Sequence, residues 1–281
     1  MDFQNLYLIG EIGINHNGDM QIAKDLMCAV RATGWHCAKF QKRDPETCVP
    51  RDQWSKIRST PWGEMTYIDY KKRIEFSEEQ YGELKSFAGH IGIDWSASVW
   101  DLKSLDVILG LRPKFLKIPS AMLCEHVLLA ESAKSGLPII ASTGMSTLEE
   151  VDAAVDVLLK STTADKVCIM HTNSSYPTPK HELNLSLIPF LRDRYKLPVG
   201  YSGHEQDLEP SVAAALLGAK VIERHITLSH DMWGTDQKAS LEVHAMSMLK
   251  KRIDSIEQIM GTPNKIVTPS EVTVREKLRG Y

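Results

Sequence analysis

The run Leu6-Tyr-Leu-Ile-Gly-Glu-Ile-Gly-Ile14 is followed by an amphipathic segment and then by a second short run, Cys37-Ala-Lys-Phe-Gln41. The first run has the length and apolar content of a parallel strand that is buried on both faces. Between the two runs, Asp19 can cap a helix that extends to about Thr33 and stops at Gly34. The stretch therefore predicts a strand, a helix and a second strand parallel to the first.

The same alternation continues to the end of the chain, with longer amphipathic segments between short apolar runs. The runs are Leu6–Ile14, Cys37–Gln41, Ile93–Val99, Phe115–Ile118, Pro138–Ser142, Val167–His171, Pro198–Ser202 and Lys220–Thr227. Two helices are expected to begin with capping boxes, at Ser77-x-x-Gln80 and Ser146-x-x-Glu149. Eight such units predict an α/β protein with a (β/α)8 TIM barrel in a single domain, residues 1–281. A doubly wound open sheet is the alternative, but no G-x-G-x-x-G turn follows the first strand.

Two segments depart from the alternation. Residues 43–73, after the second strand, are rich in Pro, Trp, Thr and charge, and we expect a long irregular loop on the catalytic face of the barrel. Residues 261–281 form a polar C-terminal tail that carries Arg275 and Arg279. Trp62 and Arg73 of the loop, or the two arginines of the tail, are candidates to contact a substrate.

Composition excludes several classes of protein. The 281 residues are 43% hydrophobic and 25% charged, with a formal net charge of −3, which does not indicate a nucleic-acid-binding protein. The sequence has no apolar stretch long enough for a transmembrane helix, and its first residues lack the features of a signal peptide. Five scattered cysteines without a C-x-x-C motif predict reduced thiols and a cytoplasmic location.

Charged residues interrupt the predicted strands at the barrel end where catalytic residues gather. Glu11, Gly13 and Asn15 share one face of the first strand by alternation, and Lys39 and Gln41 share one face of the second. Lys117 lies in the fourth strand. Lysines within apolar strands need an anionic partner, and a phosphate with a carboxylate would supply one.

Hydroxyl and amide side chains follow several of the same strands. They are Ser98, Ser120, Ser142, Thr172, Asn173, Ser174 and Ser202. Small hydroxyls and neighbouring backbone N–H groups can surround the oxygens of a phosphate. Capping of the strand ends is the structural alternative for any one of them.

Two histidines lie on adjacent predicted strands, His204 after the seventh and His225 within the eighth. Their rings can meet at the barrel mouth and hold Mn²⁺, Mg²⁺ or a similar ion with open positions. A hydrogen-bonded core role is the alternative. His16, His171 and His244 are weaker candidates.

The polar motifs in their order resemble the sialic acid synthase (N-acetylneuraminate synthase, NeuB-like) family, over nearly the whole chain. The motifs are Glu11-Ile-Gly-Ile-Asn-His-Asn-Gly18, Lys39-Phe-Gln41, Lys117-Ile-Pro-Ser120, Ser142-Thr-Gly-Met145, Tyr176-Pro-Thr-Pro179, Ser202-Gly-His204, Glu223-Arg-His225 and Gly234-Thr-Asp236-x-Lys238-Ala-Ser240. The resemblance implies a carbon–carbon bond-forming transferase of nonulosonic acid biosynthesis. It also implies a divalent metal (Mn²⁺, Mg²⁺ or Co²⁺) and a homo-oligomer, expected to be a dimer.

The resemblance also implies roles for individual residues. His204 and His225 would be the metal ligands, and Glu11, Lys39 and Lys117 the catalytic residues. Glu11, Gln41, Tyr176 and Asp236 would hold the open-chain sugar. Phosphoenolpyruvate would be bound by Lys39, Ser98, Lys117, Ser120, Ser142, Ser174 and Ser202.

The chain departs from the family pattern in three places. It reads Lys117-Ile-Pro-Ser-Ala-Met122 where a Ser-Gly-Glu sequence is usual, and Ser98 replaces a common Thr. It ends at Tyr281, before the C-terminal antifreeze-like domain of the family would begin. These departures concern the sugar more than phosphoenolpyruvate or the metal.

The resemblance therefore implies a condensation of phosphoenolpyruvate with an N-acetylmannosamine-like aldehyde, giving a sialic-acid-like acid and phosphate. Three alternatives remain: a synthase making a shorter 3-deoxy-2-keto acid, a Schiff-base aldolase using Lys117, and a catalytically inactive sugar-binding barrel.

Overall fold

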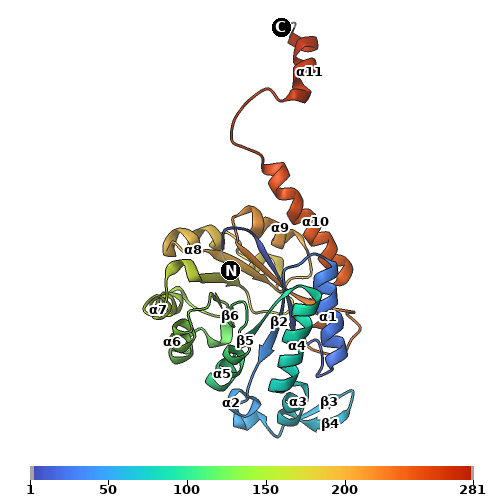
Figure 1. The fold of residues 1–281 in the computed structure, drawn as a ribbon, viewed down its shortest axis with the longest axis vertical. Helices are drawn as coiled ribbons and strands as arrows, with labels where there is room; N and C mark the ends of the chain where they lie inside the picture. The colour runs from blue at the N-terminus through green and yellow to red at the C-terminus, as the bar shows by residue number, and fades with distance from the viewer. Residues whose placement is uncertain (1–2, 280–281) are drawn as a thin grey trace.

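The computed structural model describes residues 3–279 and contains a closed barrel of eight parallel strands surrounded by helices (Figure 1). The strands follow one another around the barrel in chain order, and pairing of the first strand with the eighth closes it. They are β1 (Tyr7–Gly13), β2 (Cys37–Lys42), β5 (Asp94–Val99), β6 (Leu116–Ile118), β7 (Ile139–Ser142), β8 (Val167–Thr172), β9 (Val199–Gly203) and β10 (Val221–Thr227). The prediction of a (β/α)8 TIM barrel is confirmed.

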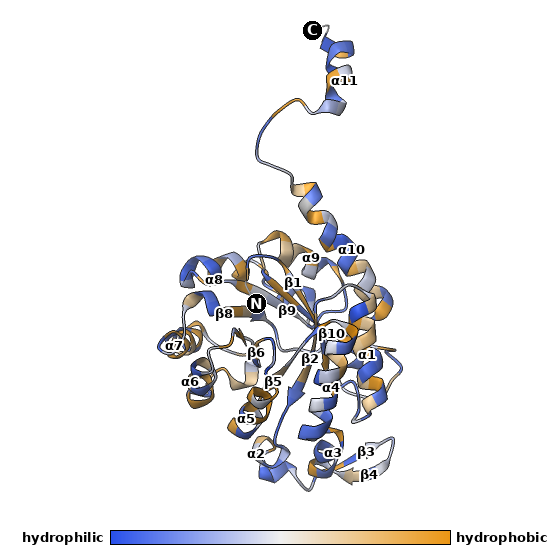
Figure 2. Cartoon of the chain, viewed as in Figure 1, coloured by the Kyte–Doolittle hydropathy of each residue, from blue (hydrophilic) through white to orange (hydrophobic). Residues whose placement is uncertain are grey.

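Amphipathic helices cover the outside of the barrel, and Figure 2 shows hydrophilic and hydrophobic residues interspersed along them. Their apolar faces pack on the strands in one continuous core. These helices are α1 (Met20–Ala32), α4 (Glu78–Ile91), α5 (Leu102–Gly110), α6 (His126–Lys134), α7 (Leu148–Leu159), α8 (Leu187–Tyr195), α9 (Glu209–Leu216) and α10 (Val243–Met260). No helix of residues 3–279 is long and apolar enough to cross a membrane.

The predicted helix starts are correct in two of three places. Asp19 caps α1 and accepts hydrogen bonds from Gln21 N and Ile22 N, and Ser77 with Gln80 forms a complete capping box. The third box lies one residue later than predicted, because Thr147 and not Ser146 accepts the hydrogen bond from N3. Glu150 therefore occupies the position that the sequence pattern assigned to Glu149.

The prediction that residues 43–73 are irregular is wrong. They form α2 (Pro45–Cys48), a hairpin of β3 (Ile57–Thr60) and β4 (Gly63–Thr66), and α3 (Tyr67–Ile74). The hairpin lies at the end of the barrel toward which β2 runs (Figure 1). Trp62 at its tip packs edge-on against Trp233, with ring centroids 5.7 Å apart.

The tail contains a helix, α11 (Pro269–Arg279), that the sequence analysis did not predict. In Figure 1, α11 stands apart from the barrel, at the end opposite the hairpin. Arg275 and Arg279 therefore do not reach the substrate end of this barrel, contrary to the expectation for the tail.

The barrel interior has an apolar layer beneath a polar one. Ile9, Cys37, Phe115, Ile140 and Val221 belong to a separate buried cluster that fills the amino-terminal end of the barrel. Two residues further along each strand, alternation brings the next inward-facing side chain, and there these side chains are charged or polar. The apolar layer thus forms the floor of a polar cavity.

Candidate active site

A cavity of about 280 Å³ lies at the carboxyl ends of the barrel strands, above the apolar floor. Twelve of the thirteen predicted site residues line it. They are Glu11, Lys39, Gln41, Ser98, Lys117, Ser120, Ser142, Ser174, Tyr176, Ser202, His204 and His225. The thirteenth, Asp236, lies beside the cavity, with Oδ2 4.0 Å from Nδ1 of His225.

Four buried charged groups occupy the bottom of the cavity. Lys39 Nζ lies 2.5 Å from Glu11 Oε2 and 3.7 Å from Glu223 Oε2. Lys117 Nζ lies 3.1 Å from Glu223 Oε1. The expectation that the lysines need anionic partners is met within the chain by Glu11 and Glu223, and binding of a phosphate by Lys39 and Lys117 stays a prediction. Burial of four charges is tolerated here because their sum is zero and each has a close opposite charge.

The buried charged groups shift one another's pKa values. Burial alone would raise the pKa of Glu223, but Lys117 and Lys39 hold it below its usual value. Burial opposes the charged form of Lys39, yet Glu11 and Glu223 raise its pKa. Burial lowers the pKa of Lys117, which Glu223 only partly offsets. Lys117 is thus the cation that would gain most from a further anion.

Hydroxyl groups surround a second part of the cavity next to Gly144. The backbone N–H of Gly144 donates to Ser120 Oγ at 3.0 Å. A Cβ atom at this position would lie 2.3 Å from Ser174 Oγ and 2.8 Å from Ser120 Oγ. Only glycine therefore leaves both hydroxyls free to face one small group, such as a phosphate. Ser142 Oγ is buried there without a hydrogen-bond partner among the described residues.

The two histidines face each other with ring centroids 5.5 Å apart. His204 Nδ1 donates to the Asn173 carbonyl at 2.6 Å, which leaves Nε2 as a lone-pair donor. Burial and His225 lower the pKa of His204 to about 3, so its ring is neutral at physiological pH. Nδ1 of His225 is buried and accepts no hydrogen bond from the described residues.

These observations fit a sparse metal site. Neutral imidazole nitrogens are good ligands for Mn²⁺, Co²⁺ and related ions. Within residues 3–279 no group of three or more His, Cys, Asp or Glu side chains is arranged to hold a metal. The two imidazoles are fewer than the four ligands of a closed structural zinc site.

Gln41, Tyr176 and Asp236, the predicted sugar-binding residues besides Glu11, lie close to the two histidines. Gln41 Nε2 donates to Glu11 Oε1 at 2.9 Å. The Tyr176 ring lies 4.0 Å from that of His204, centroid to centroid, and is 46% exposed at the mouth. The same ring lies 5.6 Å from that of His225, so Tyr176 contacts both imidazoles.

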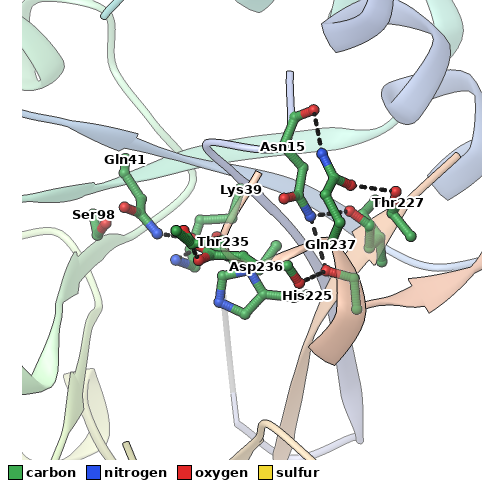
Figure 3. Close-up of polar contacts among 12 residues, drawn as sticks. Asn15, Lys39, Gln41, Ser98, His225, Thr227, Thr235, Asp236 and Gln237 are labelled. Atoms are coloured by element: carbon green, nitrogen blue, oxygen red, sulfur yellow. Dashed lines mark hydrogen bonds and ion pairs between the residues drawn. The ribbon is translucent and has the colours of Figure 1, made fainter. Parts of the chain in front are cut away.

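A hydrogen-bonded network fixes the loop that carries Asp236, as Figure 3 shows. Gln237 Nε2 donates to the Asn15 carbonyl at 3.2 Å, and Thr227 Oγ1 donates to Gln237 Oε1. Asn15 Nδ2 donates to Ser240 Oγ at 2.8 Å. Asn15 thus braces this loop and does not join Glu11 in the cavity, because β1 has a register shift between Glu11 and Gly13 that breaks the alternation.

Sequence reasoning assigned no role to Glu223, Trp100 or Met145, although all three line the cavity. Glu223 had a signal: it precedes His225 by two residues on a strand and therefore shares its inward face. The weaker metal candidates His16 and His171 are structural. His16 stacks on Phe76, and His171 Nε2 lies 2.6 Å from the Leu183 carbonyl.

Arg224 points to the opposite face of β10 and anchors the segment after His204. Its side chain is fully buried and lies 3.0 Å from Glu205 Oε1. It also donates to the carbonyls of Glu205 and Asp207 and, at 3.0 Å, to Ser211 Oγ. Arg224 thereby connects the strand of His225 to the loop of His204.

Comparison with known proteins is consistent across sequence and structure. A model of the NeuB family matches residues 26–265. The N-acetylneuraminate-9-phosphate synthase of Mus musculus is 35% identical over 275 residues, covering 97% of this chain and 76% of that protein. The N,N'-diacetyllegionaminic acid synthase of Legionella pneumophila is 32% identical, covering 97% of this chain and 78% of that protein.

A solved structure extends the likeness. The N-acetylneuraminic acid (sialic acid) synthetase of Leptospira borgpetersenii, crystallised with citrate, superposes with a TM-score of 0.86 at 27% identity. The alignment covers 99% of this chain and 94% of that chain. The likeness therefore includes the whole barrel and not only the polar motifs.

Proposed function

Because this chain belongs to the NeuB family and is a carbon–carbon bond-forming synthase, we propose that it condenses phosphoenolpyruvate with the aldehyde of an N-acetylmannosamine-like amino sugar. The products are a nonulosonic acid and phosphate. One observation carries the proposal: two lysines, two histidines and a group of hydroxyls line a single cavity at the barrel end.

The proposal also includes a single-domain organisation, a cytoplasmic location and a homodimer. The free state of all five cysteines supports the cytoplasmic location.

Phosphoenolpyruvate is proposed to lie across the floor of the cavity. The ammonium groups of Lys39 and Lys117 contact its anionic groups, and Ser98 of β5 and Ser202 of β9 contact it as well. Its phosphate oxygens occupy the space beside Gly144, among Ser120, Ser142 and Ser174. Support for this placement comes from the absent Cβ at Gly144 and the lowered pKa of Lys117.

His204 and His225 are the proposed ligands of a divalent metal, Mn²⁺, Mg²⁺ or Co²⁺. When bound, such an ion supplies polarisation of the acceptor's aldehyde oxygen. The hydrogen bond from His204 Nδ1 to Asn173 fixes the ring orientation that this role needs. Asp236, fixed by the network around Gln237, adds negative charge 4.0 Å from His225.

The acceptor is held by Glu11, Gln41, Tyr176 and Asp236. Carbon 3 of phosphoenolpyruvate forms a bond to the aldehyde carbon with the electron pair of its double bond, and water adds to the electron-poor carbon 2. One proton of the water passes to the aldehyde oxygen; the bond from carbon 2 to the phosphate oxygen then breaks, the second proton leaves with the phosphate, and a keto group remains. Glu11 is placed to move a proton or position water, because it lies between Lys39 and Gln41.

Phosphate release from phosphoenolpyruvate with a panel of acceptors tests this function. We expect release with hexosamine-type aldehydes and Mn²⁺, and a product detected by mass spectrometry that contains acceptor plus the three-carbon keto-acid unit. Release only with four- or five-carbon aldose phosphates would instead indicate a synthase of shorter keto acids. Borohydride trapping of pyruvate on Lys117 would indicate a Schiff-base aldolase, and sugar binding without turnover an inactive barrel.

Removal of the β3–β4 hairpin is expected to raise the Michaelis constant for the acceptor several-fold. Trp62 packs on Trp233 close to the Asp236 loop, and Arg73 lies 4.5 Å from the Trp62 ring centroid. Tyr67 N donates to the Lys56 carbonyl at 2.8 Å, so residues 57–66 can be replaced by a two-glycine linker. Steady-state kinetics checks this, with the constant for phosphoenolpyruvate as internal control. An unchanged Michaelis constant for the acceptor would show that the hairpin does not contribute to sugar binding.

A further inference from the structure

A second cavity, of about 190 Å³, adjoins the first at Trp100, whose side chain lines both. It is formed largely by the segment after β2, including Pro45, Val49 and Tyr67. Its charged lining groups are Arg43, Lys71 and Glu75. A cavity of about 150 Å³ can accommodate a benzene molecule, so this space is large enough for one small polar group.

Arg43 connects this second cavity to the acceptor side of the first. Its guanidinium lies 3.8 Å from the ring centroid of Trp100 and donates to Gln41 Oε1. Gln41 in turn donates to Glu11. The Nε atom of Arg43 is buried and has no hydrogen-bond partner among the described residues. A fixed guanidinium with an unused buried N–H is prepared to bind an anion.

Lys71 adds a second cation to the lining of this cavity. Its Nζ lies 5.3 Å from the ring centroids of Tyr67 and Tyr70, and in residues 3–279 it has no carboxylate at ion-pair distance. Burial and the charge of Arg43 lower the pKa of Lys71 to about 8. Repulsion between two partly buried cations destabilises the free protein, and a bound anion would relieve it.

The one carboxylate of the lining does not neutralise this pair. Glu75 accepts from Lys42 Nζ at 2.7 Å, so its charge is already matched. Outside the lining, Asp236 raises the pKa of Lys71, and Arg58 of the hairpin, whose guanidinium lies 4.6 Å from the Tyr67 ring centroid, lowers it. The second cavity therefore carries an excess of positive charge beside the proposed binding site of the acceptor.

We propose that Arg43 and Lys71 form a subsite for a phosphoryl group on the acceptor, so that the substrate is a phosphorylated amino sugar. This inference rests on the proposed condensation. The aldehyde end lies near Glu11 and the histidines, and the chain of contacts from Glu11 through Gln41 to Arg43 leads outward to the subsite. Arg43 offers the planar donor pair that suits a phosphoryl group, and Lys71 offers a point charge.

The test compares N-acetylmannosamine with its 6-phosphate, in the presence of phosphoenolpyruvate and Mn²⁺. The wild-type protein is expected to favour the phosphorylated acceptor in kcat/KM by about tenfold or more, as expected for charge-assisted contacts. Lys71→Met is expected to remove most of this preference, and Lys71→Arg to retain it. Arg43→Gln should reduce the preference as well.

Lys72→Met is the matched control, since Lys72 is the next residue of α3 and pairs with Glu46 on the surface. This variant should keep the preference of the wild-type protein. Binding of N-acetylmannosamine 6-phosphate can also be measured by calorimetry without phosphoenolpyruvate. It should be weaker in Lys71→Met than in the wild-type protein and unchanged in Lys72→Met.

The outcomes separate the two proposals. Turnover of both acceptors with equal kcat/KM in the wild-type protein, or equal losses for both in Lys71→Met, would overturn the subsite and leave the condensation standing. Absence of phosphate release with either acceptor would overturn the condensation and the subsite together.

Discussion

Replacement of His225 by alanine is expected to abolish phosphate release from phosphoenolpyruvate. His225 contributes one of the two imidazoles at the proposed metal position, and its buried Nδ1 has no hydrogen-bond partner among the described residues. With one protein ligand left, metal affinity should fall by orders of magnitude. Bound Mn²⁺, measured by mass spectrometry after gel filtration, provides a readout that does not depend on turnover.

His204→Ala removes the other ligand and should give the same result, which guards against a folding defect specific to position 225. His181→Ala is the control, because that side chain is 81% exposed and lies outside the cavity. Thermal melts establish that each variant is folded. Full activity of a folded His225→Ala protein would discard the metal role of these histidines.

Replacement of Arg224 by methionine is expected to destabilise the fold by about 3–5 kcal/mol, the cost of leaving a buried ion-pair partner alone. Glu205 is itself almost completely buried, and its remaining hydrogen bond comes from Tyr201 Oη at 2.8 Å. Loss of the guanidinium also frees the carbonyls after His204. We therefore expect a lower free energy of unfolding in urea and weaker metal retention.

Arg194→Met provides the matched comparison for this variant. Arg194 makes a bidentate ion pair with Asp152, with Nε 3.0 Å from Oδ1 and Nη2 2.6 Å from Oδ2, but its side chain is 40% exposed. Exposed pairs contribute about 0–1 kcal/mol. Equal destabilisation by the two substitutions would show that Arg224 has no special role.

The strands could be predicted from sequence because both of their faces are buried. Each run, such as Phe115–Ile118, is short, apolar and bounded by turn residues, and all eight strands lie within one residue of the predicted limits or inside them. The Asp19 cap could be predicted because it is local: its side chain accepts hydrogen bonds from backbone N–H groups two and three residues later.

The segment after β2 was not predictable in the same way. Its hairpin buries little by itself: Ile57 is 62% exposed and the β3–β4 pair has few apolar residues. Its structure depends on distant contacts such as that of Trp62 with Trp233, which no local pattern encodes. The position of Asn15 was missed for a related reason, because a register shift in β1 cannot be read from alternation.

The charged residues of the cavity could be predicted because charge is rare in apolar strands. Which lysine pairs with which carboxylate could not be predicted. Lys39 and Lys117 were expected to have an anionic partner, with a phosphate and a carboxylate as the suggested source, but the carboxylate was not identified. The structure places Glu223 between them, contributed by the strand that closes the barrel. Such a pairing depends on which strands meet across the interior, and that information is absent from any single stretch of sequence.

A crystal structure with Mn²⁺ and phosphoenolpyruvate, using anomalous diffraction to locate the metal, would show where both bind. We expect the metal between the rings of His204 and His225, and the phosphate beside Gly144 within reach of Lys117. A metal bound elsewhere, or a phosphate remote from both lysines, would contradict this expectation.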